Sequence, residues 1–90
     1  MIWKVEFDDR ARKELRKLDK QTQDRILKWL RTNLATEDDP RRTGKSLKGR
    51  MKGLWRYRVG DYRIISQIQD EHILILVIRI GHRRDIYDKK

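Results

Sequence analysis

The spacing of apolar and polar residues changes twice along the chain. Residues 1–7 alternate, with Trp3 and Val5 on one side and Lys4 and Glu6 on the other, which predicts a β-strand. The apolar residues that follow recur at helical spacings up to the middle of the chain. The period then returns to two, so we expect the second half to form β-strands.

Two amphipathic helices are expected after the first strand. Asp8 or Asp9 can cap the first helix and Asp19 the second, because an aspartate accepts hydrogen bonds from the free N–H groups of a first helical turn. The apolar stripes consist of Ala11, Leu15 and Leu18 in the first helix and Ile26, Leu27, Leu30 and Leu34 in the second. Pro40 and the acidic residues before it end this helical hairpin in a loop.

The second half predicts three strands. Residues 41–52 are basic and show almost no apolar periodicity, so we expect a loop or a short turn. Strands are expected over residues 54–59, 62–69 and 73–78, with a turn at Gly60-Asp61 between the first two. The last strand is apolar on both faces, as a central strand would be.

These elements make an α+β domain. We expect an N-terminal strand, a two-helix hairpin and a three-stranded antiparallel meander, with the helices on one face of the sheet. Trp55 and Tyr57 are expected in the core beneath the sheet, with stacking on bases as the alternative. Arg56 and Arg58 alternate with them and project from the opposite face, where Arg63 can join them. The predicted result is an open, concave, arginine-lined surface.

The charge of this single domain, residues 1–90, is concentrated in one segment. The chain has 24 lysines and arginines against 14 acidic residues, a formal net charge of +10. Residues 41–63 hold nine of these cations against Asp61 alone. Such a block is typical of a nucleic-acid surface, although a solubilising face would have the same composition. We favour a polyanionic partner because the surplus is concentrated rather than scattered.

The residue types present do not support several other kinds of chemistry. The chain has no cysteine and only two histidines, so neither a metal nor another cofactor is expected. Thr43-Gly44-Lys45-Ser46 imitates a phosphate-binding loop, but Asp39 stands where that motif needs a glycine. The longest apolar run is too short to span a bilayer, and Lys4 and Glu6 interrupt the N-terminal apolar stretch. We therefore expect a cytoplasmic protein without a signal peptide or membrane contact.

Three segments resemble a known family. Leu47–Gly49, Trp55–Arg63 and Gly81–Tyr87, in this order, resemble the RelE/ParE superfamily of toxins from bacterial and archaeal toxin–antitoxin modules. The resemblance covers nearly the whole chain and implies the same fold. RelE-type members are endoribonucleases that cut mRNA in the ribosomal A site, whereas ParE-type members inhibit DNA gyrase. In the RelE-type reaction the 2′-hydroxyl of the RNA attacks the adjacent phosphate and leaves a 2′,3′-cyclic phosphate, without a metal or a protein nucleophile.

The resemblance also implies roles for individual residues. Arg56 and Arg58 correspond to the basic pair on the first meander strand, and Arg63 to the arginine that stabilises the transition state. Arg83 corresponds to the arginine at the leaving 5′-oxygen, and Tyr87 to the tyrosine that orients or deprotonates the 2′-hydroxyl. The basic pair is lysine in the best-known pattern, and an arginine cannot act as a base.

Two further sets of residues complete the candidate site. The position of His82 beside Arg83 suggests that it could take over part of the proton transfer, and a phosphate contact or a structural hydrogen bond is an equal alternative. Contacts with RNA or the ribosome are expected from the remaining cations, Arg41, Arg42, Lys45, Lys48, Arg50, Lys52 and Arg84.

We therefore expect a ribosome-dependent, metal-independent mRNA endonuclease. Its partners would be the ribosome, mRNA and a cognate antitoxin that is acidic where it meets the basic face. A ParE-like gyrase inhibitor without nuclease activity is the first alternative, and a non-catalytic RNA- or ribosome-binding module is the second. The combined basic and aromatic set favours the nuclease, because a gyrase inhibitor does not need it.

Overall fold

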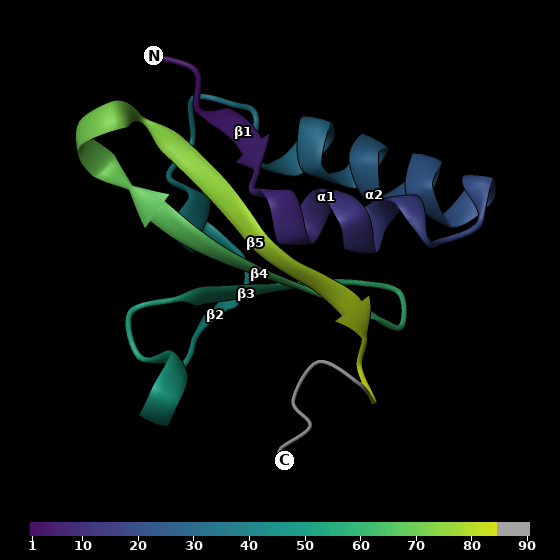
Figure 1. Cartoon of the computed structure of the whole chain (residues 1–90). Helices are drawn as coiled ribbons and strands as arrows, with labels where there is room; N and C mark the ends of the chain where they lie inside the picture. Colours follow the sequence, from purple (N-terminus) through teal and green to yellow (C-terminus); the bar gives the residue numbers. More distant parts are fainter. Residues whose placement is uncertain (85–90) are drawn as a thin grey trace.

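The computed structural model describes residues 1–84 and contains one five-stranded sheet with both helices on one of its faces (Figure 1). The strands are β1 (Lys4–Phe7), β2 (Lys45–Ser46), β3 (Trp55–Val59), β4 (Tyr62–Gln69) and β5 (Leu74–His82). Their order across the sheet is β1-β5-β4-β3-β2, in which β1 runs parallel to β5 and all other neighbours are antiparallel. The predicted α+β class and the antiparallel meander are confirmed.

Both helices begin where the aspartates predict. α1 spans Asp9–Arg16 and α2 spans Lys20–Asn33. The Asp8 carboxylate accepts a hydrogen bond from the Ala11 N–H at 2.9 Å, and the Asp19 carboxylate accepts from both the N–H and the hydroxyl of Thr22. These side chains satisfy backbone donors that a first helical turn leaves open, and so fix each helix start. Within residues 1–84, no helix is both long and apolar enough to cross a membrane.

The core lies between the helices and one face of the sheet. Its buried apolar residues are Ala11, Leu15, Ile26, Leu30, Leu34, Tyr57, Val59, Ile64, Ile75, Val77 and Ile80. The Tyr57 hydroxyl donates a hydrogen bond to the Pro40 carbonyl at 2.8 Å, and its ring centre lies 5.7 Å from that of Trp29. Burial raises the pKa of Tyr57 well above its ordinary value. The prediction that Tyr57 belongs to the core is confirmed.

The basic segment between α2 and β3 contains an edge strand that the sequence analysis did not predict. In β2, Lys45 pairs with Arg56 of β3, and short 3₁₀ turns at Pro40–Arg42 and Gly49–Met51 flank the strand. Gly44, directly before β2, has a φ of +79°, and a Cβ there would clash with the Arg56 carbonyl oxygen. Two paired residues are too few to show an alternating pattern, so the expectation of a simple loop is wrong at this point.

β5 differs from its prediction in length and in burial. It continues to His82, because its pairing with β4 runs as far as Tyr62. It is an interior strand between β1 and β4, but only Ile75, Val77 and Ile80 are buried, and the residues between them are half-buried. The expectation of a strand covered on both faces is wrong, because the helices cover only one face of the sheet.

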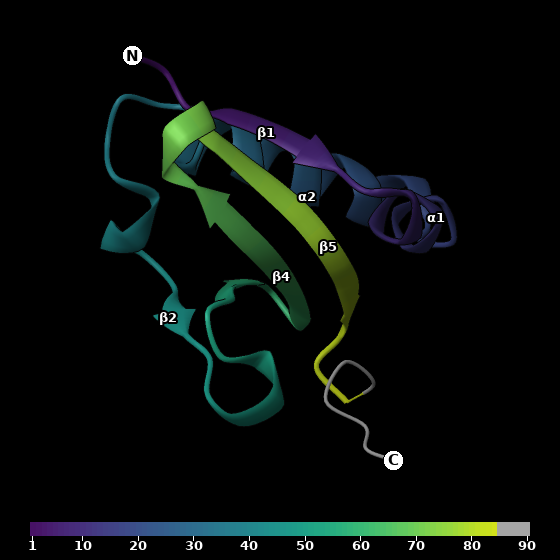
Figure 2. The same cartoon turned by 60° about the vertical axis from the view of Figure 1, so that its left-hand side comes forward.

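The far part of β5 is completed by a helix instead of a strand. β1 ends at Phe7, opposite Val77, and the chain turns there into α1 (Figure 2). Beyond that point the Glu14 carboxylate of α1 accepts a hydrogen bond from the Ile80 N–H at 2.8 Å and another from the Arg79 Nε at 3.1 Å. One carboxylate thus replaces the missing strand partner and neutralises a cation, which fixes α1 on the sheet.

Candidate nucleic-acid interface

Three arginines lie on the sheet face that the helices leave open. Arg58 is directly opposite Arg63 in the β3–β4 pairing, and Arg56 follows two residues away on the same side of β3. Tyr57 and Val59, which alternate with them, are buried under the helices, so the arginines face away from the helices. We name Arg56, Arg58 and Arg63 the arginine cluster. The structure brings together the three residues that the sequence placed on this face.

The direct opposition of Arg58 and Arg63 brings two positive charges together on this face. Directly opposed residues of antiparallel strands place their Cβ atoms about 4.5–5.5 Å apart, and like charges at that position destabilise a sheet. Within residues 1–84, no carboxylate lies within ion-pair distance of Arg56 or Arg58. Guanidinium groups are planar forks of donors that suit phosphate oxygens. The cluster is therefore complementary to a phosphodiester.

A cavity of about 260 Å³ opens beside the arginine cluster, where β2 meets β3. Its lining includes Arg56 and Arg58 together with Lys45 and Trp29. Lys45 lies opposite Arg56 in the β2–β3 pairing and therefore shares its face. Of the predicted RNA contacts, Lys45 thus adds its charge directly to the cluster.

The end of β5 brings one predicted residue towards the cluster and turns another away. The Arg83 N–H donates a hydrogen bond to the Asp61 carbonyl at 2.8 Å, which holds Arg83 beside the β3–β4 turn. His82 pairs with Tyr62, and the two rings meet edge to face with centres 5.6 Å apart. Tyr62 in turn pairs with Val59, which is buried under the helices. His82 therefore lies on the opposite face of the sheet, and the structure does not bring it together with the arginine cluster.

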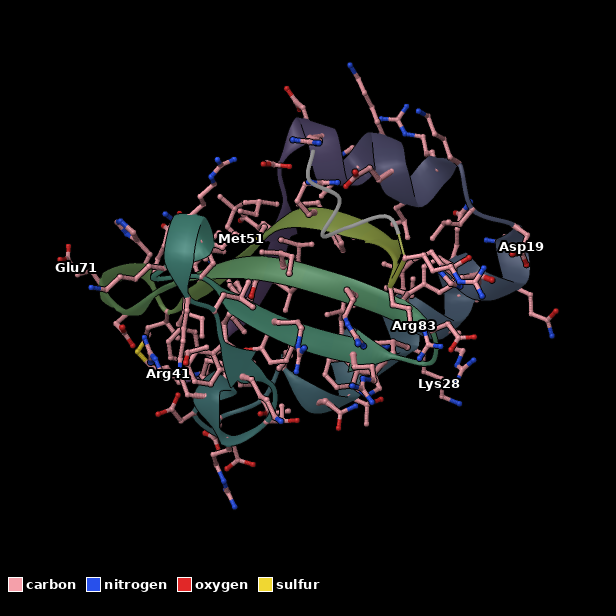
Figure 3. All side chains as sticks on the ribbon, turned by 90° about the horizontal axis from the view of Figure 1, so that it is seen from below. Asp19, Lys28, Arg41, Met51, Glu71 and Arg83 are labelled. Carbon is pink, nitrogen blue, oxygen red and sulfur yellow. The ribbon has the colours of Figure 1, made fainter. Side chains whose placement is uncertain are left out.

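Arg41 has a carboxylate partner of its own. Its guanidinium forms two hydrogen bonds to the Asp70 carboxylate, at 3.0 and 2.7 Å. These bonds lower the pKa of Asp70 and raise the pKa of Arg41. Figure 3, viewed from below, places Arg41 and Glu71 towards one end of the molecule and Arg83 towards the other. Arg41, although part of the basic segment, is thus paired within the chain, at the end of the molecule away from Arg83.

The other predicted cations lie at the surface. Arg42 contacts the Asp38 carboxylate at 3.3 Å. Four further predicted cations are exposed and do not line the cavity beside the cluster, namely Lys48, Arg50, Lys52 and Arg84. Tyr87 lies outside the described residues. Within residues 1–84, no group of three histidine, aspartate or glutamate side chains is placed to hold a metal ion.

Two cations on α2 also lie at this site, although the sequence did not indicate them. Arg25 and Lys28 are exposed there and, together with Trp29 and Arg58, line a second cavity of about 420 Å³. In the sequence these charges look like the ordinary polar face of an amphipathic helix. Only the packing of α2 beside β3 shows that they adjoin the arginine cluster. The available signal was Trp29, a large aromatic residue outside the apolar stripe of its helix.

The chain matches known toxins along most of its length. A family model described as the ParE toxin of the type II toxin–antitoxin system, parDE, matches residues 5–87. Toxin RelG of Mycobacterium tuberculosis is 34% identical over 87 residues, which cover 97% of this chain and 98% of the relative. The mRNA interferase toxin RelE of Escherichia coli is 32% identical over 85 residues, which cover 92% of this chain and 85% of the relative.

Solved structures give the same result. The crystal structure of a toxin–antitoxin complex from Mycobacterium tuberculosis matches with a TM-score of 0.84 at 30% identity, covering 94% of this chain and 95% of that chain. The intact RelBE toxin–antitoxin complex of Escherichia coli matches with a TM-score of 0.70 at 29% identity, covering 89% and 95%. The chain therefore belongs to the RelE/ParE family and is a RelE-like toxin of a type II toxin–antitoxin system.

Proposed function

We propose that this toxin is a ribosome-dependent endoribonuclease that cuts mRNA in the A site. The observation that carries the proposal is the arginine cluster, in which two arginines oppose each other across β3 and β4 and a third lies beside them. Relatives from Escherichia coli and Shigella flexneri that are named mRNA interferases support the same activity. The cluster lies on the face of the sheet that α1 and α2 do not cover (Figure 1).

In the proposed reaction the RNA supplies its own nucleophile. The 2′-oxygen forms a bond to the adjacent phosphorus, and the bond from that phosphorus to the 5′-oxygen breaks. The 2′-hydroxyl loses a proton and the leaving 5′-oxygen gains one, so the products are a 2′,3′-cyclic phosphate and a 5′-hydroxyl. Negative charge increases on the non-bridging oxygens in the transition state, where preorganised cations stabilise it most effectively.

The arginine cluster is proposed to supply those cations. A guanidinium stays protonated and donates from a fixed plane, so the cluster can hold and stabilise the phosphate but cannot take the 2′ proton. Arg83, held beside the β3–β4 turn, is proposed to stabilise the leaving oxygen. The family resemblance assigns the 2′-hydroxyl to Tyr87. We leave His82 out of the mechanism because its side chain lies on the other face of the sheet.

A cognate antitoxin is the partner that the structural neighbours indicate, since several of them are toxin–antitoxin complexes. We propose that an acidic segment of this antitoxin covers the arginine cluster. Such a segment would supply the carboxylates that Arg56 and Arg58 lack within residues 1–84. Antitoxin and RNA would then exclude each other, and purified antitoxin should displace a labelled oligoribonucleotide from the toxin.

The decisive experiment uses ribosomes programmed with a defined A-site codon. The wild-type toxin should cut the mRNA and leave a 2′,3′-cyclic phosphate end. Arg63→Ala should abolish cleavage while weakening ribosome binding only modestly, because one of several cations is lost. Arg31→Ala, which removes an equal charge from the exposed surface of α2, should cut normally. Intact mRNA after incubation with folded wild-type toxin would contradict the proposal.

One observation favours a second candidate, inhibition of DNA gyrase. The family model that matches residues 5–87 is that of the ParE toxin. The two functions separate in a parallel assay with gyrase and relaxed plasmid. Blocked supercoiling together with undamaged translation and intact mRNA would assign the toxin to gyrase and remove the nuclease proposal.

A further inference from the structure

A groove runs from the arginine cluster around the edge of the sheet to α2. The cavity of about 260 Å³ beside the cluster and the cavity of about 420 Å³ beside α2 share Trp29 and Arg58 in their linings. The two cavities therefore adjoin at these side chains. We name them together the edge groove.

The edge groove exists because β3 is only partly paired on its outer side. β2 pairs with Trp55 and Arg56 alone, so no strand of the described chain covers the outer side of β3 from Tyr57 to Val59. Trp29 of α2 fills part of this space and tilts against the buried Tyr57 ring at 5.7 Å. Its half-buried ring is the aromatic part of a groove whose other lining residues include Thr32, Asn33 and Val59.

The rim of the edge groove is positively charged. Arg25, Lys28 and Arg58 are exposed, and within residues 1–84 none of them has a carboxylate in ion-pair distance. The Arg25 side chain extends to the β3–β4 turn, where a Cβ built at Gly60 would lie 2.9 Å from the Arg25 Nη1. Arg25 and Lys28 are three residues apart on one helix, which places their side chains next to each other.

We propose that the edge groove binds single-stranded RNA that continues from the strand held by the arginine cluster. Arg25 and Lys28 bind phosphates outside the cut bond, and a base stacks against the open part of Trp29. A cationic track with an aromatic platform is the arrangement by which proteins bind single strands without reading their sequence. The proposal rests on the proposed function in that RNA is the ligand, and it adds a second binding surface to the toxin.

The first test compares oligoribonucleotides of two lengths. Fluorescence anisotropy measures binding of strands of about four and about twelve nucleotides, of which only the longer can reach both surfaces. The double variant Arg25→Gln/Lys28→Gln should bind the longer strand about tenfold more weakly and the shorter strand normally. The dependence of log K on log salt for the longer strand should become shallower by about 1.4, since each of two lost phosphate contacts contributes about 0.7.

Matched variants keep this test specific. Lys13→Gln/Arg31→Gln removes the same charge from exposed positions outside the edge groove and should leave both strands unaffected. Arg58→Gln should weaken both strands, because Arg58 belongs to the cluster and to the groove. An equal loss for both charge-neutralising double variants, or no difference between the two strand lengths, would overturn the proposal. If Arg25→Gln/Lys28→Gln weakens binding of polyglutamate but not of RNA, the groove binds an acidic protein instead. That result would also overturn the proposal.

Programmed ribosomes separate the groove from the proposed function and identify the RNA. If cleavage is absent while the length-dependent loss remains, the nuclease proposal fails and the groove proposal stands. If cleavage is present and Arg25→Gln/Lys28→Gln binds like the wild type, the groove proposal alone fails. A defect confined to mRNA that extends past the A-site codon would identify the bound strand as mRNA. An equal defect on mRNA truncated at that codon would show that the groove binds another RNA, such as ribosomal RNA, and would overturn the proposal.

Discussion

Two groups of arginines in this toxin differ in what faces them. Arg41 and Arg79 each donate to a carboxylate, that of Asp70 and that of Glu14 respectively. In the arginine cluster, Arg58 instead faces a second arginine across the β3–β4 pairing. The first group joins distant parts of the chain, whereas Arg56 and Arg58 have no carboxylate partner within residues 1–84 and are complementary to an anion from outside. The number of cations in a segment therefore says less about binding than the partners that the fold gives them.

The two paired arginines also differ in burial. The Arg79 and Glu14 side chains are each 22% exposed, and Glu14 also accepts a backbone N–H. Arg41 and Asp70 are 37% and 64% exposed, so water screens their attraction. We therefore expect the pair at α1 to matter for the fold and the pair at Asp70 to matter much less.

The largest expected effect comes from removing a cation of the cluster. Arg58→Ala should slow mRNA cleavage on programmed ribosomes by about 10²–10³-fold, because a preorganised cation is lost from the developing charge. The free energy of unfolding should stay unchanged or rise slightly, since a like-charge pair is removed from the sheet. Single-turnover cleavage and urea unfolding measure the two quantities. If Arg58→Ala lowered the free energy of unfolding as much as Glu14→Ala, Arg58 would be a structural residue like Arg79 and not a binding residue.

Removing the partner of Arg79 should lower stability and leave cleavage nearly unchanged. Glu14→Ala should lower the free energy of unfolding by about 3 kcal/mol, because Arg79 and the Ile80 N–H both lose their acceptor. Cleavage measured well below the unfolding transition should be nearly normal. Glu6→Ala, at an exposed position on β1, is the matched control and should unfold like the wild type. Normal stability of Glu14→Ala would contradict the structural role of this pair.

The next effect concerns the backbone that supports the arginine cluster. Gly44→Ala should lower the free energy of unfolding by about 2 kcal/mol, because a positive φ and a clash with the Arg56 carbonyl oxygen combine there. Gly49→Ala has a positive φ of 65° but nothing within 4 Å of the added Cβ, so it should cost only about 1 kcal/mol. Urea unfolding of both variants measures the difference. Equal losses would show that β2 does not pack on β3 as described.

The sequence predicts features that depend on neighbouring residues but not contacts between residues far apart in the chain. The α2 stripe and its Asp19 cap depend on neighbouring residues, and both are confirmed. The opposition of Arg58 and Arg63 follows from a two-residue turn, which fixes the register of the strands it joins. The partner of Arg41 lies 29 residues away and is brought to it only by the packed fold. The same reason explains why the cations of α2 were overlooked beside β3.

The wrong end of β5 had the largest effect on the predicted site. If the strand ended at residue 78, His82 would lie beyond the sheet in a charged tail that could fold towards the arginine cluster. Pairing that continues to Tyr62 instead fixes its face by simple alternation, on the side of the helices. Boundaries are the least secure part of a pattern, because the signal fades where polar residues begin. Because β5 extends four residues beyond its predicted end, His82 no longer takes part in the proposed mechanism.

The smallest expected effect belongs to the exposed pair and has a pH signature. Arg41 lowers the pKa of Asp70 in the folded chain relative to the unfolded chain, so the stabilisation is present above the unfolded pKa and is lost as pH falls through the folded pKa. The Tm of the wild type should therefore exceed that of Asp70→Asn slightly at neutral pH, and the gap should close as pH falls below about 4. In an Arg41→Gln background the gap should be absent at every pH. Added salt should shrink it too, since both groups face water. A gap that is independent of pH would mean that Asp70 stabilises the fold through something other than its charge.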